Sequence, residues 1–373
     1  MKFNKKLLSG VLAALMAGSM LSGCGSSAAP ASSAAAADTS KAQEAPASSV
    51  AESVSGESSL KGERVRVVIG STSTSGDSYM VADIVTRYLA KEMGFNGKVD
   101  GIGNARALEE ISKAKGDGTT IMMFHDMTFM SVLFGAVDEK YALENLTVGP
   151  RIGQNPGACF GAKADAPYNT LKEMSEWLKA NPDKEVRINI EAGGTSHIGF
   201  VAYWLWAKET YGEEVTNRIR VIVGGTTAEK LQVLWDGNAD VIFGDYSAFK
   251  QYTEDGVEAQ LKMKIMDPLD KIAGIDIKTI AEDGITFKGK PFVFSKDFAM
   301  YFPKEMDPAI LSEIEAAMKK VANNPDFQKE MADMTYKTVD MNVADSQFFI
   351  YDKRELCKEL IAVAPNLDDV TVK

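Results

Sequence analysis

The residues best suited to chemistry are glycines and small hydroxyl side chains gathered in three short stretches. These are Thr74–Asp77, Gly193–Ser196 and Gly225–Thr227. Each follows an apolar strand pattern and precedes a helical one, and the glycine pairs at 193–194 and 224–225 permit turns that are closed to other residues. Such a turn leaves backbone N–H groups unpaired at the positive end of a helix dipole. The sequence therefore predicts binding of an anion at these turns.

The elements that position these turns alternate along the chain. Apolar residues recur at period two in the strands and at helical spacing in the segments between them. Alternation of this kind predicts an α/β fold of mostly parallel sheets flanked by helices, with ligands bound beyond the carboxyl ends of the strands. We predict strands at residues 65–69, 99–102, 120–124, 146–152, 158–162, 186–190, 219–223 and 239–243, and an irregular pattern after residues 263–266. We predict helices at residues 80–89, 104–115, 171–180, 195–209, 226–235, 310–321, 327–334 and 346–360.

The first sixty residues do not fit a folded domain. Three lysines precede a short apolar run, and Leu21–Cys24 has the form of a lipobox, which predicts a lipoprotein signal peptide over 1–23 and lipid on Cys24. Residues 24–60 are rich in Ser and Ala and nearly free of large apolar side chains, so we predict a disordered tether. The protein would then be extracytoplasmic and anchored to the cell membrane.

The net charge and the cysteines bear on the kind of partner and on the redox state of the protein. The formal net charge is −11, and removal of residues 1–23, which carry three lysines and no acidic residue, would make it −14. This acidity argues against a nucleic-acid partner, but an anionic ligand can still be held by local dipoles. Cys159 and Cys357 can form a disulfide outside the cytoplasm or remain as buried free thiols, and the sequence leaves both open.

The order of these motifs resembles that of the substrate-binding proteins of tripartite tricarboxylate transporters, over roughly residues 65–360. The first loop lacks the proline and paired glycines usual in that family, and Thr119 stands where an aromatic residue is common. The matching motifs are Ser75-Gly76-Asp77, Gly103-Asn104 with Asp117–Thr120, Gly193–His197, Gly224–Thr226 with Gly237–Asp240, and Ala281–Gly284.

The resemblance implies a two-lobed, periplasmic-binding-protein-like (type II) fold with a ligand cleft between the lobes. It implies lobe 1 at 61–157 and 283–373 and lobe 2 at 158–282, with crossings near Gly157 and Glu282. It further implies a monomer without a cofactor or metal, which closes on a small organic anion (a di- or tricarboxylate or related acid) and delivers it to the permease subunits of a secondary transporter. The residues predicted to bind the ligand are Thr74, Ser75, Gly76, Asp77, Asn104, His125, Asp126, Gly193, Gly194, Thr195, Ser196, His197, Gly225, Thr226, Thr227 and Asp245.

Several of these residues also have a simpler structural explanation. Asp77 can cap its helix, and an acidic side chain suits an anion site only when it binds an ammonium group, a water or a cation. His125, Asp126 and His197 can equally hold local structure. We expect Asp117 and Asp240 to stabilise turns, and Trp204 and Trp206 to lie in the core.

Other functions remain as alternatives. A lipid-anchored hydrolase is one, although the chain has only two histidines, no metal-binding Cys/His spacing, no Gly-x-Ser-x-Gly elbow and no Walker A motif. A receptor for an amino acid or another solute is a second alternative. A ligand-sensing partner of a membrane kinase is a third.

Overall fold

The computed structural model describes residues 57–74 and 76–372. The predicted signal peptide, Cys24 and most of the predicted tether lie outside the described residues, as does Ser75. The predicted tether extends too far, because Leu60 is buried in the core and the amide of Ser59 donates to Glu313 Oε2 at 2.8 Å. Burial of the large apolar side chain of Leu60 favours packing of this end of the segment against the core.

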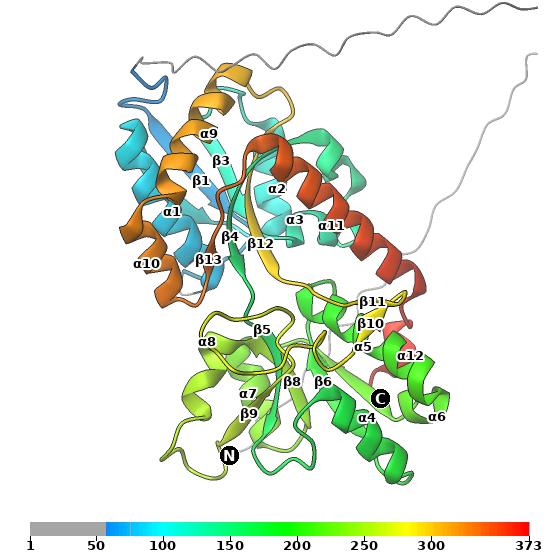
Figure 1. Cartoon of the computed structure of the whole chain (residues 1–373). Helices are drawn as coiled ribbons and strands as arrows, with labels where there is room; N and C mark the ends of the chain where they lie inside the picture. The colour runs from blue at the N-terminus through cyan, green and yellow to red at the C-terminus, as the bar shows by residue number, and fades with distance from the viewer. Residues whose placement is uncertain (1–56, 75, 373) are drawn as a thin grey trace, which may run out of the picture. The chain divides into compact units, whose positions relative to one another are not determined.

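Two sheets organise these residues (Figure 1). The first has the strand order β13-β4-β12-β3-β1-β2 and the second the order β7-β6-β8-β5-β9. The strands of the first sheet are β1 (Arg64–Ile69), β2 (Asn96–Gly101), β3 (Thr120–Phe124), β4 (Leu146–Asn155), β12 (Lys296–Pro303) and β13 (Lys337–Thr338). Those of the second are β5 (Ala158–Lys163), β6 (Val186–Ile190), β7 (Ile219–Val223), β8 (Val241–Asp245) and β9 (Met263–Met266), and a separate hairpin pairs β10 (Thr286–Phe287) with β11 (Lys290–Pro291).

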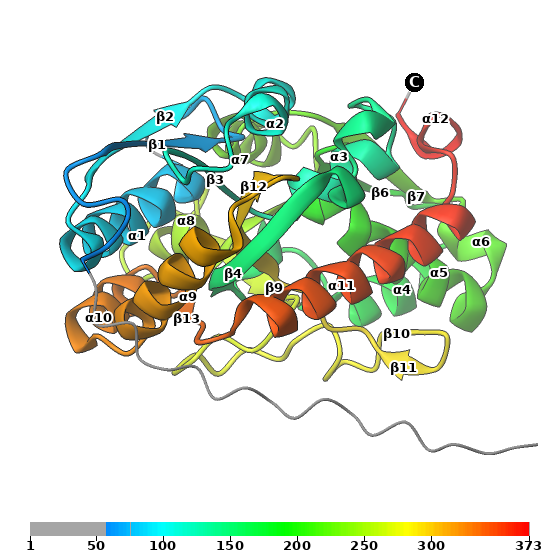
Figure 2. The ribbon, with the colours of Figure 1, turned by 90° about the horizontal axis from the view of Figure 1, so that it is seen from above.

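Helices cover the faces of both sheets (Figures 1 and 2). Helices α1, α9 and α10 pack together beside the first sheet, whereas α4, α5 and α6 pack beside the second. The longer helices are α1 (Asp77–Met93), α2 (Asn104–Lys113), α3 (Met127–Leu133), α4 (Leu171–Ala180), α5 (Thr195–Tyr211), α7 (Thr227–Trp235), α9 (Pro308–Ala322), α10 (Pro325–Asp333) and α11 (Val343–Val363). The shorter ones are α6 (Glu213–Thr216), α8 (Tyr246–Phe249), α12 (Leu367–Val370) and the 3₁₀ turns at Glu139–Tyr141, Leu143–Asn145 and Lys250–Tyr252.

The α/β class is confirmed, but the sheets are mixed, so the prediction of mostly parallel sheets is wrong in this respect. Parallel pairing joins β2-β1-β3 and β7-β6-β8, whose strands are linked through helices. The strands that lie outside these βαβ units, β4, β5, β9, β12 and β13, pair antiparallel. Without a crossover helix nothing favours a parallel partner.

The chain passes between the sheets more than once. Strand β4 ends at Asn155 in the first sheet and β5 begins at Ala158 in the second, and the chain returns between Met266 and Lys296. Helix α11 then packs on β4 and also on α5, and Thr371 forms a parallel bridge with Val221 of β7. Thr371 and Val372, at the end of the described residues, therefore lie against the second sheet.

Helix α5 is buried on almost every side, as its continuous apolar sequence requires. Trp204 and Trp206 are each 8% exposed, which confirms their place in the core. Cys159 and Cys357 are buried free thiols. Among the described residues, no helix is both long enough and apolar enough to cross a membrane.

Candidate ligand-binding cleft

The ends of strands from both sheets line one cavity of about 870 Å³. The first sheet contributes the loop after β1, the end of β3 and the start of β12. The second contributes the loops after β6 and β7 and the end of β8. A volume in this range is typical of a small-molecule site.

The turn before α5 presents unsatisfied donors to the cavity. Gly193 adopts φ +76°, a left-handed value that favours glycine, and its amide donates to His197 Nδ1 at 3.2 Å. The amides of Gly194, Thr195 and Ser196 have no acceptor among residues 57–74 and 76–372. Thr195 lines the cavity, is only 6% exposed, and its hydroxyl also lacks a partner within the described chain. A buried hydroxyl and three free amides at a helix N-terminus form a site for an anion.

The turn before α7 is held by a capping box. Thr226 Oγ1 accepts from the Glu229 amide, and the Glu229 carboxylate accepts from the Thr226 amide at 2.6 Å. This reciprocal pair uses the Thr226 side chain for structure. Thr227, at the first position of the helix, lines the cavity.

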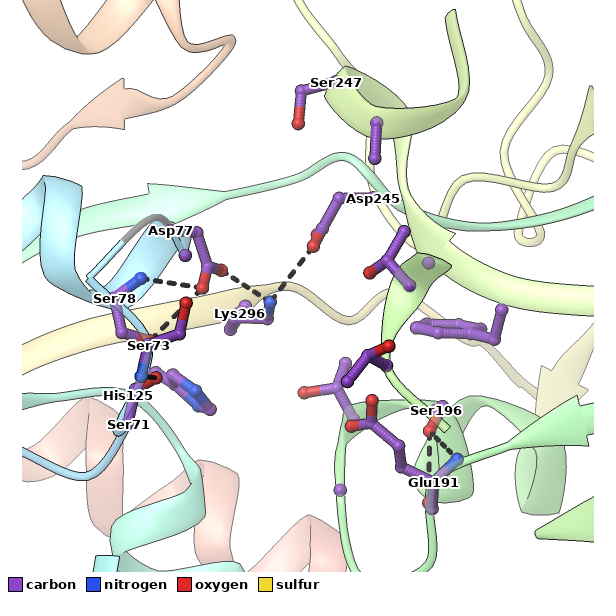
Figure 3. Close-up of a pocket in the computed structure, with 18 of the residues that line it drawn as sticks. Ser71, Ser73, Asp77, Ser78, His125, Glu191, Ser196, Asp245, Ser247 and Lys296 are labelled. Atoms are coloured by element: carbon purple, nitrogen blue, oxygen red, sulfur yellow. Dashed lines mark hydrogen bonds and ion pairs between the residues drawn. The ribbon is translucent and has the colours of Figure 1, made fainter. Parts of the chain in front are cut away.

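An ion pair occupies the other side of the cavity. Lys296 Nζ lies 2.7 Å from Asp77 Oδ2 and 3.5 Å from Asp245 Oδ2, so this lysine from β12 sits between α1 and the end of β8 (Figure 3). Burial alone would raise the pKa of Asp77, but the Lys296 charge outweighs it and lowers that pKa to about 2. Burial would lower the pKa of Lys296, but Asp245 and Asp77 outweigh it and raise that pKa. Asp77 and Lys296 are therefore both charged at neutral pH.

The two histidines are neutral in this environment. Burial and the nearby Lys296 charge lower the pKa of His125, a cavity residue, to about 3. Burial lowers the pKa of His197 to about 4. The His197 ring stacks on Phe134 with centroids 4.7 Å apart, so it closes a contact between α5 and the end of α3.

Some of the predicted site residues lie together in the cavity and others do not. Thr74 is exposed and is not among the cavity residues, and Ser75 is not described. Asn104 donates to Met127 O and Ser131 Oγ instead of facing the cavity. The predicted residues that line the cavity are Gly76, Asp77, His125, Gly194, Thr195, Ser196, Thr226, Thr227 and Asp245. Four further predicted residues do not line it: Asp126, Gly193, His197 and Gly225.

Asp126 belongs to a buried ion network next to the cavity. Its Oδ2 accepts from Lys353 Nζ at 2.7 Å and from the Asp297 amide at 3.0 Å. Lys353 of α11 also lies 2.5 Å from Asp297 Oδ2, and Arg151 of β4 pairs with the other oxygen of Asp297. This network ties α11, β12, β4 and the end of β3 together.

Sequence reasoning missed Lys296, Glu191, Lys230 and Tyr336, all of which line the cavity. Glu191 ends the strand pattern two residues before Gly193, and that position beside the predicted turn was the signal that could have placed it in the site. Its pairing with Lys230, 39 residues later, has no local signal. Lys296 precedes an apolar run for which no strand was predicted. No group of three or more potential metal ligands occurs within the described part of the chain.

Comparison with known proteins identifies the relatives of this chain. The model of the tripartite tricarboxylate transporter family receptor matches residues 80–365, so the first loop lies outside the match. No curated protein matches the sequence.

Solved structures share the fold at low sequence identity. A structure described as a periplasmic transporter has a TM-score of 0.62 at 16% identity, over 83% of this chain and 98% of that one. MatC from Rhodopseudomonas palustris, solved with bound malate, has a TM-score of 0.61 at 15% identity, over 80% and 99%. The R. palustris protein Rpa4515, solved with adipate, has a TM-score of 0.61 at 14% identity, over 81% and 99%. These likenesses confirm the two-lobed fold class.

Proposed function

Because the chain belongs to the tripartite tricarboxylate transporter receptor family, we propose that it captures a small carboxylate in this cavity and delivers it to a membrane transporter. The observation that carries the proposal is the set of unpaired donors at the start of α5, the amides of Gly194–Ser196 with the buried Thr195 hydroxyl. Hydrogen bonds from such donors to a carboxylate are about twice as strong as neutral ones. The malate in MatC and the adipate in Rpa4515 are carboxylates bound by proteins of the same fold.

The cavity lies where a two-lobed receptor would close. We propose lobe 1 at 61–157 and 283–373 and lobe 2 at 158–282, with the final residues reaching across to β7 as a further link. Contacts that would part on opening are Lys296 with Asp245 and Phe134 with His197. Closure by hinge rotation would present one defined surface to the permease subunits. The family is one of receptors, and the proposal involves no catalysis.

Thermal unfolding of the purified protein against mono-, di- and tricarboxylates, amino acids and phosphate tests the binding function. A ligand at 100 times its dissociation constant stabilises the protein by about 2.7 kcal/mol, a clear shift in the midpoint. We expect one or a few carboxylate-bearing compounds to give that shift and phosphate to give none. The protein should first be refolded to remove bound solute. If none of the compounds then shifts its unfolding midpoint, the result would contradict the proposal.

We further propose that the chain is an extracytoplasmic lipoprotein anchored through Cys24. The support is the basic stretch, the apolar run and the lipobox at Leu21–Cys24. In cells, the wild-type protein should fractionate with membranes and carry the mass of a lipid, whereas Cys24→Ser should do neither. An unmodified wild-type protein in the soluble fraction would show that the anchor does not exist.

A further inference from the structure

The centre of the cavity holds more negative than positive charge. Asp77 and Asp245 carry two negative charges and Lys296, between them, carries one positive charge (Figure 3). His125, which also lines the cavity, is neutral, because burial and the Lys296 charge lower its pKa to about 3. The three charged groups therefore leave a net charge of −1 where the ligand would lie.

The remaining basic side chains of the cavity do not neutralise this excess. Lys230 is only 3% exposed, and its ammonium is already bonded to Glu191 Oε1 at 2.9 Å and to the Phe243 carbonyl at 3.2 Å. Lys250 is exposed, so solvent screens its charge. Asp333, the remaining acid of the lining, forms an exposed ion pair with Lys329 at 2.6 Å.

Asp245 has acceptor capacity left for a ligand. Its Oδ1 accepts from Asn155 Nδ2 at 2.8 Å, but its Oδ2 lies 3.5 Å from Lys296 Nζ. That distance exceeds the 2.7–2.9 Å of a well-formed charge-assisted bond. Lys296 instead bonds closely to Asp77, and the Asp245 side chain remains 24% exposed to the cavity. A carboxylate in this state favours an added cation over an added anion.

An acid without a positive group fits this pocket poorly. The donors before α5 can hold one carboxylate, but each further negative charge of a di- or tricarboxylate would meet the net negative centre. A ligand that carries its own ammonium group supplies the missing charge. Since Asp77 is already paired with Lys296, the open partner for that ammonium is Asp245.

We propose that the ligand is a zwitterionic acid, a small carboxylate that also carries a protonated amine. Its carboxylate binds the amides of Gly194–Ser196 and the Thr195 hydroxyl, and its ammonium binds Asp245. The inference rests on the proposed function and narrows the ligand class of the same cavity. A ligand with an ammonium group also explains why an acidic residue, Asp245, lines a site that binds a carboxylate.

The test is isothermal titration calorimetry in the presence of a chelator, with pairs of acids that differ only in the amine. Suitable pairs are aspartate and succinate, glutamate and glutarate, 4-aminobutyrate and butyrate, and alanine and propionate. In the pair that binds, the amine-bearing member should bind at least tenfold more tightly. Asp245→Asn, which keeps the shape of the side chain, should weaken that member at least tenfold and reduce or reverse the preference.

Asp333→Asn is the matched control, because it makes the same change at an exposed lining acid that is already paired with Lys329, and it should leave both affinities unchanged. If Asp245→Asn does not fold, Asp245→Ser is the alternative variant that removes the same charge. Tight binding of an amine-free acid, with no gain from the amine, would overturn the zwitterion proposal and leave the receptor function standing. Loss of the amine preference only in Asp333→Asn would also overturn it. If none of the acids binds, with or without an amine, the result would instead contradict the receptor function itself.

Discussion

At the scale of single residues, the binding site depends on donors that the fold leaves unused. Thr195 begins α5, and its amide and hydroxyl both lack acceptors among the described residues although the side chain is buried. Leaving such groups unpaired costs free energy unless a ligand completes them. The Lys296 ammonium shows a contrasting case, because it already bonds to Asp77 within the protein.

Thr195→Pro tests the donors of this turn. Proline is tolerated at the first position of a helix, and Gly194 has ψ −172°, an extended value compatible with a following proline. The change removes one amide donor and one hydroxyl, so we expect binding to weaken roughly 10- to 100-fold, while ligand-free stability changes by less than about 1 kcal/mol. Calorimetric titration and urea unfolding measure the two quantities.

Val343→Pro provides the control for Thr195→Pro. It places proline at the first position of α11 after Asn342, whose ψ of 168° is likewise extended. This variant should bind the ligand as the wild type does. Unchanged affinity in Thr195→Pro would mean that the ligand does not use the start of α5.

At the scale of elements, the βαβ units follow from the sequence and the strands that join them do not. The strands Thr120–Phe124, Val186–Ile190 and Ile219–Val223 have the predicted bounds, because a polar residue or a glycine flanks the apolar pattern at each end. Strand β12 was not predicted. Its residues Asp297–Pro303 are buried on both faces, so apolar residues run without alternation, and the preceding stretch lacks a clear pattern.

Because β12 was not predicted, its cavity residue Lys296 was not predicted either. The glycine turns of the anion site could be predicted because their chemistry is local and each sits between a strand and a helix. Lys296 reaches Asp77 from more than two hundred residues away. Only the order of strands in the first sheet brings these two residues together, and no local pattern encodes that order. Asp126 shows the same limit, since its partner Lys353 comes from α11.

Lys353→Met tests how far the buried network holds α11 in place. The Lys353 side chain is 7% exposed, and its ammonium compensates Asp126 and Asp297, whose side chains are fully buried. Removing one member of a buried charge network leaves an uncompensated charge, so we expect a loss of about 3–5 kcal/mol in the free energy of unfolding. Urea denaturation measures it. The exposed Lys358→Met, on the same helix, should cost less than about 1 kcal/mol; equal effects of the two changes would refute a structural role for the network.

At the scale of the whole molecule, stability should depend on pH through the two histidines of the chain. Burial lowers the pKa of His125 to about 3 and that of His197 to about 4, below the usual value near 6.5. Between these values and pH 6.5, the two histidines are therefore protonated in the unfolded chain and neutral in the folded chain. The stabilisation is complete above about pH 6.5 and is lost as the pH falls toward the folded values.

Replacing both histidines with glutamine isolates this effect. Each histidine should contribute about 2 kcal/mol to the loss of stability between pH 7 and pH 5, so the double variant should lose about 4 kcal/mol less than the wild type over that interval. Asp267 acts in the opposite direction, since burial raises its pKa, but both proteins retain it. Urea unfolding at the two pH values gives the comparison. Identical losses in the two proteins would show that the histidines titrate normally in the folded state.

The distribution of strands between the two sheets also governs the order in which the molecule can fold. The strands of the second sheet all lie within residues 158–266, an uninterrupted stretch, whereas in the first sheet β12 must insert between β3 and β4 after that stretch has passed. A chain that becomes available from its N-terminus can complete the second sheet while β3 still has an open edge with unpaired backbone groups. Open edges of this kind recruit other chains. The interval before residues 296–303 arrive is therefore the period in which the nascent protein is most exposed to aggregation, and the one in which a chaperone would protect it most.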